Sequence, residues 1–246
     1  MLRKPTPEVP VENRLLKCIS DRTAKAVNAA ARRLTFKPGE TIYHADDEIT
    51  LCYFPSGGMV SLLSANGDGR MIEAGYTGFE GMVGAAVLFK RYKMPYHAIA
   101  QSEVECTVIS AEQVIKIFDQ DALFRTASLH FGHVLIKQFV QTCVCNHFHS
   151  VESRACRWLS VLAERSRHAH ISLTQEFLAM ILGVRRASIS DVHTALRTEG
   201  LIEYNRGRIR IVDLQGMRDR ACECYQIIKA EHELLRTGLI ELCVDE

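Results

Sequence analysis

Hydrophobic and polar positions change their period along the chain, and this change divides it into a β part and a helical part. Between residues 33 and 109, short segments of alternating, β-branched or aromatic residues predict strands. These segments are TIYH (41–44), LCYF (51–54), MVSLL (59–63), RMIEAGY (70–76), YHAIAQ (96–101) and VECTVI (104–109). Between two of them, Asn66-Gly67 favours a hairpin because its turn needs positive φ. Many short strands at this spacing predict a β-roll or sandwich.

Helical periodicity frames the β part on both sides. A short helix is expected near residues 13–31, and residues 122–148 contain no proline and one glycine, which favours one long helix. The long helix has two apolar stripes, one through Phe124 and Phe131 and the other through Leu129, Ile136 and Val140. Two stripes imply two burial partners. Either the helix lies inside one core, or it packs on its own β part along one side and on a second subunit along the other.

Two amphipathic segments meet at Gly183 in the stretch SLTQEFLAMILGVRRASISDVHTALRTEGLIEY (172–204). Thr174 can cap the first segment and Gly183 can end it. The second segment begins at Arg186 and buries Ile189, Val192 and Leu196, while its outer face carries Arg186, Ala187, Ser190, Asp191 and either His193 or Thr194. This arrangement predicts a helix-turn-helix, and the following EYNRGRIRIVD predicts a basic hairpin beside it, before a terminal helix from about residue 214.

The chemistry of this segment suits DNA. An arginine in the first turn of the second helix can bond guanine in the major groove, while helix N-termini can hold phosphates. Residues 150–212 hold ten lysines and arginines against six acidic residues, whereas residues 213–246 hold four against eight. The candidate DNA-binding residues are Thr174, Gln175, Arg185, Arg186, Ser188, Ser190, Asp191, Arg206 and Arg208. The alternative is a solvated helical hairpin with incidental arginines.

Composition narrows the class of protein. The chain has 246 residues, of which 47% are hydrophobic and 24% are charged, as in an ordinary globular protein. Because its net charge is only +1, any positive charge that binds DNA must be concentrated in one region. Because no apolar run approaches roughly 20 residues and the N-terminus lacks signal-peptide features, we expect a cytoplasmic protein without a membrane partner. No nucleophile–base pair or phosphate loop is found, so we expect no enzyme activity and assign no catalytic residue.

The nine cysteines include two segments of interest, CVCNHFH (143–149) and CEC (222–224). Cys-x-Cys with a nearby histidine can bind zinc or respond to oxidation. However, Cys143 and Cys145 lie about 200° apart around a helix, so both cannot easily ligate one ion. Cysteine also serves as a small buried apolar residue, and no metal ligand is assigned. Near the N-terminus only Cys18 and Cys52 occur, so no iron–sulfur cluster is expected.

The order of β part, long helix, LTQEFLAMILGVRRASISDVHTALRTEGLI and basic hairpin resembles the Crp–Fnr family of bacterial transcription regulators over residues 13–213. The resemblance implies an α+β fold: a cyclic-nucleotide-binding-type β-roll (13–118), a dimerisation helix and hinge (119–149), and a winged helix-turn-helix domain with a C-terminal helix (150–246). It implies a homodimer through helix 122–148, a two-fold-symmetric double-stranded DNA operator, and RNA polymerase as a partner. The alternative function is a cyclic-nucleotide-sensing module that acts through a protein partner.

The resemblance also assigns individual residues. Arg186 falls on the first base-reading position, whereas Ala187 stands where many members carry a base-contacting glutamate, and Asp191 where the catabolite activator has arginine. These departures imply a different operator sequence. GFEGMVGAAVLF (78–89) matches the cassette around ribose and phosphate, which gives the effector-pocket candidates Glu80, Gly81, Gly84, Tyr96 and His97.

The effector itself stays unidentified. Members that bind cyclic nucleotides carry a phosphate-binding arginine shortly after this cassette, where the present chain has Tyr96-His97. A neutral histidine lacks the permanent charge and fork of arginine, which argues against ordinary cyclic AMP binding. The roll could therefore bind another effector or serve only as a scaffold.

Overall fold

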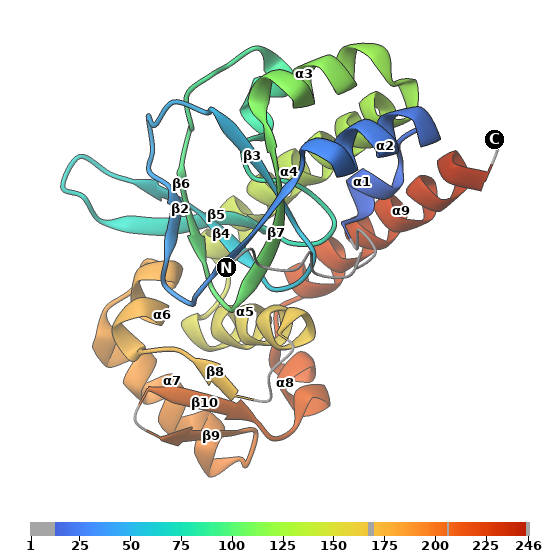
Figure 1. The fold of residues 1–246 in the computed structure, drawn as a ribbon. Helices are drawn as coiled ribbons and strands as arrows, with labels where there is room; N and C mark the ends of the chain where they lie inside the picture. The colour runs from blue at the N-terminus through green and yellow to red at the C-terminus, as the bar shows by residue number, and fades with distance from the viewer. Residues whose placement is uncertain (1–12, 167–169, 206, 245–246) are drawn as a thin grey trace, which may run out of the picture.

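The computed structural model describes residues 13–166, 170–205 and 207–244 and combines helices with antiparallel sheets. A β-roll with flanking helices forms one part, and helices α5 to α8 with a small sheet form the other (Figure 1). About 51% of the chain is helical and 23% is strand, which confirms the predicted α+β class. Within the described ranges, no helix has the length and hydropathy needed to cross a membrane.

The β-roll consists of two antiparallel sheets, with strand orders β1–β7–β3 and β2–β6–β4–β5. Its strands are β1 (Arg32–Phe36), β2 (Thr41–Tyr43), β3 (Leu51–Pro55), β4 (Val60–Ala65), β5 (Met71–Thr77), β6 (His97–Ala100) and β7 (Val104–Ser110). All six strand segments that the sequence predicts are present. Strand β1 was not among them, because four of its five residues are exposed and it lacks a clear apolar alternation.

The hairpin between β4 and β5 is confirmed, but its turn differs from the predicted one. Positive φ occurs at Gly69 rather than at Gly67. The Asn66 side-chain oxygen accepts hydrogen bonds from the backbone N–H groups of Asp68 and Arg70, at 3.1 and 2.9 Å. This Asx-type turn lengthens the loop and moves the left-handed residue to its end.

Side-chain caps decide where the flanking helices begin. The sequence predicted one helix near residues 13–31, and this is wrong, because α1 (Arg14–Lys17) and α2 (Asp21–Ala30) are separate. The Ser20 hydroxyl accepts from the Thr23 N–H as the N-cap of α2 and donates to Asp121 at 2.9 Å. Asp121 in turn separates α3 (Ala111–Gln120) from α4 and caps α4. A short 3-10 helix, η1 (Ala85–Phe89), lies between β5 and β6.

Helix α4 (Ala122–Phe148) is one continuous helix, as predicted. Its first apolar stripe, including Phe124 and Phe131, is buried against the roll. Its second stripe is open to solvent in the single chain, with Leu129, Ile136 and Val140 exposed by 54%, 59% and 59%. The helix therefore has one covered and one uncovered apolar face.

The second part of the chain packs directly on the roll. It contains α5 (Val151–Arg165), β8 (His170–Ser172), α6 (Gln175–Leu182), α7 (Arg186–Thr198), β9 (Ile202–Asn205), β10 (Arg208–Ile211) and α8 (Leu214–Arg220). Strand β8 was not predicted and completes a sheet of order β8–β10–β9. The fully buried Trp158 of α5 shares a hydrophobic core with Met59 and Tyr76 of the roll region. Its indole N–H donates to buried Glu73 of β5 at 2.9 Å.

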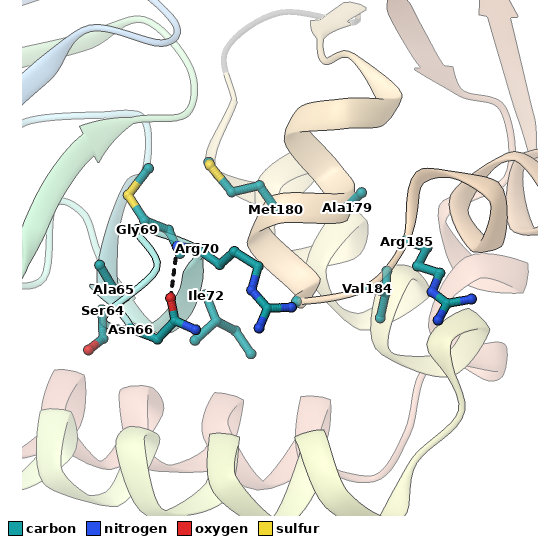
Figure 2. A pocket seen from close by; sticks show the side chains of 12 residues that line it. Ser64, Ala65, Asn66, Gly69, Arg70, Ile72, Ala179, Met180, Val184 and Arg185 are labelled. Atoms are coloured by element: carbon teal, nitrogen blue, oxygen red, sulfur yellow. Dashed lines mark hydrogen bonds between the residues drawn. The ribbon is translucent and has the colours of Figure 1, made fainter.

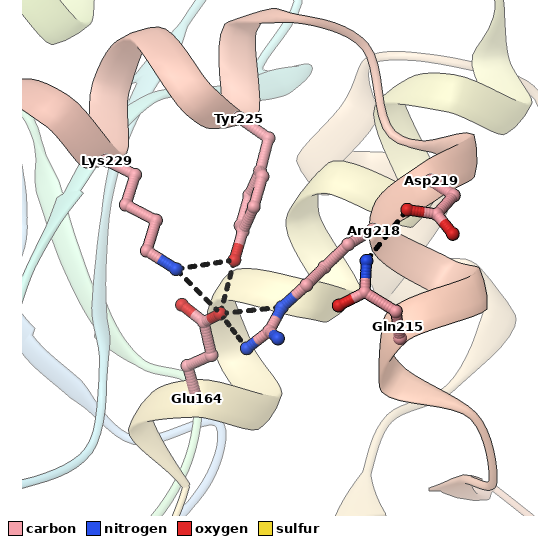
Figure 3. A network of polar contacts seen from close by, with 6 residues as sticks. All are labelled: Glu164, Gln215, Arg218, Asp219, Tyr225 and Lys229. Atoms are coloured by element: carbon pink, nitrogen blue, oxygen red, sulfur yellow. Dashed lines mark hydrogen bonds and ion pairs between the residues drawn. The ribbon is translucent and has the colours of Figure 1, made fainter.

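The C-terminal region forms two helices where the sequence predicted one, because the chain turns between α8 and α9 (Cys224–Val244). A polar network fixes this turn: Glu164 of α5 accepts from Arg218 of α8 at 3.0 Å and from the Tyr225 hydroxyl of α9, with Lys229 nearby (Figure 3). Helix α9 then runs back along α4 (Figure 1). Tyr225 and Ile228 of this helix are buried in the core that holds α5 to α8, whereas Leu235 is buried in the core of the roll.

Candidate nucleic-acid interface and sensor residues

The helix-turn-helix forms as its local sequence predicts. The Thr174 hydroxyl accepts from the Phe177 N–H at 3.1 Å and caps α6. Gly183, with φ of 64°, ends α6 in the left-handed conformation that glycine adopts without strain. Helix α7 then begins at Arg186 and is anchored by Ile189 and Leu196, which are fully buried. This anchoring fixes which face of α7 points outward.

The outward face of α7 starts with Arg186 and continues through Ala187, Ser190, Asp191 and Thr194, all exposed. Arg185 just before it is exposed as well, whereas Ser188 is half-buried. Arg186 pairs with Glu176 of α6 at 2.9 Å, with side chains 66% and 59% exposed. Exposed ion pairs of this kind contribute little to the stability of the fold. A stronger acceptor on a ligand could therefore take the guanidinium from Glu176.

His193 does not lie on this outward face, which the sequence left open between His193 and Thr194. It is 2% exposed, and its ring packs against Tyr204 of β9 with centroids 4.8 Å apart. Its Nδ1 lies 3.3 Å from the side-chain amide of Gln175, which ties that predicted contact residue to α7. Burial lowers the pKa of His193, so the ring is neutral at neutral pH.

The hairpin of β9 and β10 lies beside the start of α6. The Leu173 N–H donates to the Gly207 carbonyl at 2.8 Å, which brings the hairpin loop next to Thr174. Arg208 is exposed on β10, whereas Arg210 on the same strand pairs with Glu203, Nε to carboxylate, at 2.9 Å. Arg206 lies outside the described residues. Thr174 and the loop before Arg208 thus sit together at one end of the helix pair.

Two features that position the turn between α6 and α7 were not predicted from the sequence. Buried Arg154 of α5 donates to the Leu182 carbonyl at the end of α6 and to Asn146 at 2.8 Å. A cleft of about 810 Å³ separates the β4–β5 hairpin from the turn, and Figure 2 shows Arg70 reaching across it. At the closest approach, a Cβ on Gly183 would lie 2.6 Å from the Ile72 side chain. The roll therefore touches the turn directly, which no local pattern indicates.

Glu80, the first effector-pocket candidate, is engaged by residues from outside the roll. Its carboxylate is 3.1 Å from Arg165 of α5 and 3.8 Å from His232 of α9, and it is 2% exposed. Burial alone would raise the pKa of Glu80, but Arg165 and then His232 hold it below its ordinary value. The Arg165 guanidinium also lies over the Tyr76 ring, 4.8 Å from its centroid. Glu80 therefore joins α5 and α9 to the roll.

The other effector-pocket candidates are also occupied within the chain. A Cβ on Gly81 would lie 2.0 Å from the Phe131 ring of α4, and Gly84 adopts φ of 95° at the start of η1. Burial raises the pKa of Tyr96 to about 12, and its ring contacts Phe139. His97 accepts from the Ala45 N–H at 3.3 Å through Nδ1. Because Phe131 fills the space at Gly81 and Glu80 holds Arg165, these residues do not fit a cyclic nucleotide bound through ribose and phosphate.

Comparison with known proteins matches both parts of the chain. Residues 33–121 match the model of the cyclic nucleotide-binding domain, and residues 153–220 match that of the Crp-like helix-turn-helix domain. None of the curated protein sequences compared with the chain matches it.

Several solved structures share the fold. FixK2 from Bradyrhizobium japonicum is 15% identical with a TM-score of 0.65, covering 78% of this chain and 98% of that one. A putative crp/fnr-family regulator from Eubacterium rectale is 17% identical with a TM-score of 0.64, covering 82% and 94%. TTHB099, a CRP-family regulator from Thermus thermophilus, is 22% identical with a TM-score of 0.63, covering 76% and 96%. With both domain models matched in order on this shared fold, the chain belongs to the Crp–Fnr family of DNA-binding transcription regulators.

Proposed function

We propose that this regulator binds a two-fold-symmetric double-stranded DNA operator as a homodimer, with α7 in the major groove and the β9–β10 wing against the backbone. The observation that carries the proposal is the exposed face of α7, which opens with Arg186 and is set by the buried Ile189 and Leu196. A protein that acts on operators in this way works in the cytoplasm. We propose RNA polymerase as the partner through which it changes transcription.

The uncovered stripe of α4 supports the homodimer. Leu129, Ile136 and Val140 recur at seven- and four-residue spacing and are all more than half exposed. This is the spacing of a helix seam that packs against a second helix. Two copies joined there would present two α7 helices, and an operator with half-sites ~34 Å apart would match them.

Control by a signal would act through the contacts between the two parts. Glu80 with Arg165, and Glu73 with Trp158, connect the roll to α5, and Ile72 contacts the turn at Gly183. A signal that alters the roll or α4 would change how the two helix-turn-helix units of the dimer are placed relative to each other. Since the sensor residues do not fit ribose and phosphate, we propose an effector other than cyclic AMP bound in that way.

Replacing Arg186 with alanine tests the assignment of α7. We expect affinity for the selected operator to fall by about 5- to 150-fold, corresponding to about 1–3 kcal/mol for a lost base contact, with little change on unrelated DNA. The operator is first selected from random double-stranded DNA with the wild-type protein, and binding is then measured by fluorescence anisotropy. Arg22→Ala, on exposed α2, is the matched control. Equal affinity of Arg186→Ala and wild type for the operator would contradict the role of Arg186.

The wing is tested by salt dependence. If Arg208 contacts a phosphate, Arg208→Ala should weaken binding to all sequences and reduce the slope of log K against log salt by about 0.9 for each subunit. Arg210→Ala is the control on the same strand, because Arg210 is already paired with Glu203. Titrations at several salt concentrations give both slopes. A slope for Arg208→Ala that equals the wild-type slope would show that Arg208 does not contact the DNA backbone.

A further inference from the structure

Two cysteine segments that are far apart in the sequence meet where α4 ends and α8 passes into α9. Cys145 and His149 lie one helical turn apart at the end of α4, while Cys222 and Cys224 belong to the α8–α9 connection and the first residue of α9. Each residue offers one ligand atom, and these three Sγ atoms and one ring nitrogen all lie within 4.8 Å of one another. The three cysteines are buried and His149 is half-buried.

We propose that these four side chains bind one Zn²⁺ ion in tetrahedral coordination. Three thiolates and one imidazole are a frequent ligand set of structural zinc. Zn–S bonds of about 2.3 Å and Zn–N bonds of about 2.0 Å place neighbouring ligand atoms of a tetrahedron ~3.5–3.8 Å apart. The Sγ atoms of Cys145 and Cys222 are 3.5 Å apart, and so are Cys224 Sγ and His149 Nδ1. The side chains are therefore already close to the required spacing.

The histidine has the second contact that a zinc ligand needs. While His149 Nδ1 faces Cys224, its Nε2 lies 2.9 Å from the Glu223 carboxylate. A ligating histidine ordinarily donates its other ring N–H to a carboxylate or carbonyl, which fixes the ring and its tautomer. Glu223 stands between the two cysteine ligands in the sequence. The segment CEC thus supplies two ligands and the group that orients a third.

The surroundings of the cluster carry positive charge that a thiolate site would offset. Arg154 and Arg157 of α5 are 6% and 4% exposed, and the Nε atom of each lacks a hydrogen-bond partner among the described residues. Three thiolates around a divalent cation leave one net negative charge. Together with buried Glu73, which also acts on Arg157, such a site would offset guanidinium charge that neutral thiols cannot offset.

Other uses of these residues explain less of the geometry. A disulfide between Cys145 and Cys222 would not explain why Cys224, His149 and Glu223 lie beside them. A polynuclear iron–sulfur cluster would spread its thiolates around several atoms, whereas these ligand atoms are gathered at the spacing of a single ion. Cys143 is exposed and lies outside the cluster. The ion would tie the end of α4 to the α8–α9 connection, where the roll and the DNA-binding part meet.

The test uses the full chain, purified under reducing conditions without chelators, with metals measured by mass spectrometry. We expect close to one zinc per chain in the wild type and in Cys143→Ser, and loss of zinc in Cys145→Ser and Cys224→Ser. Glu223→Gln should bind zinc about 10- to 100-fold more weakly, as expected when the group behind a ligating histidine is removed. Co²⁺ in place of zinc should give the visible bands of a tetrahedral thiolate site.

A second readout does not depend on how well the serine variants fold. In the wild-type chain in urea just below its unfolding transition, where local opening exposes buried thiols, added Zn²⁺ should protect Cys145, Cys222 and Cys224 from alkylation, while exposed Cys143 reacts equally with and without the ion. The proposal is overturned if the chain takes up neither Zn²⁺ nor Co²⁺, if alkylation of the three cysteines is unchanged by zinc, or if the isolated protein holds several irons or a Cys145–Cys222 disulfide instead.

Discussion

Replacing both Ile136 and Val140 with glutamate should leave the chain folded but monomeric, and operator affinity should fall by about 10²–10⁴-fold. Both side chains are 59% exposed in the single chain, so the substitution removes no packing from its core. In a dimer joined along α4 the same positions would become buried, and four carboxylates would face each other at the seam. A monomer holds only one half-site and loses the gain from binding both halves together.

Sedimentation equilibrium gives the mass of the variant, and anisotropy with the selected operator gives its affinity. The matched control is Lys116→Glu with Gln120→Glu, which places two glutamates one turn apart on exposed α3. That control should remain dimeric and bind normally. If the α4 variant keeps the dimer mass, the interface lies elsewhere on the molecule and the open stripe of α4 has another use.

Replacing Glu80 with glutamine should destabilise the chain by about 3–5 kcal/mol, because it leaves the buried Arg165 charge without its partner. The two side chains are 2% and 10% exposed and 3.1 Å apart, so water cannot replace the lost carboxylate charge. His232, 3.8 Å from the same carboxylate, is also 10% exposed. Since Arg165 belongs to α5, the variant should loosen the DNA-binding part from the roll as well as lower overall stability.

The same pair predicts how stability depends on pH. The folded-state pKa of Glu80 lies below its ordinary 4.5, so its stabilising contribution is complete above that value and is lost as pH falls through the folded pKa. Burial lowers the pKa of His232 from 6.5, so the unfolded chain takes up that proton first as pH falls below 6.5. Wild-type stability should therefore decrease on acidification, and its advantage over Glu80→Gln should shrink below about pH 4.5.

Urea unfolding at a series of pH values measures both effects. Glu112→Gln on exposed α3 is the control and should change stability by less than about 0.5 kcal/mol. Replacing Glu80 and Arg165 together with leucine and methionine should cost less than the sum of the single changes, because neither charge is then left unpaired. Additive losses in this cycle would show that the two residues do not stabilise each other.

Local patterns were sufficient for the secondary elements that carry function. Period-two alternation located six strands of the roll, and helical periodicity without proline located α4. Thr174, Gly183 and the apolar positions of α7 defined the helix-turn-helix, because caps and buried faces depend on residues only a few positions apart. The break at Ser20 was also written locally as a cap, but it was overlooked within a longer helical pattern.

By itself, then, the sequence determined the order of roll, long helix and helix-turn-helix, and the outward position of Arg186. Only the tertiary structure decided that Glu80 meets Arg165, that His193 is buried against Tyr204, and that Cys145 lies beside Cys222, 77 positions away. The physical reason is that periodicity records which face of an element is buried but not which element covers it. The partners depend on where α5 and α9 return against the roll, and that is set by packing of the whole core.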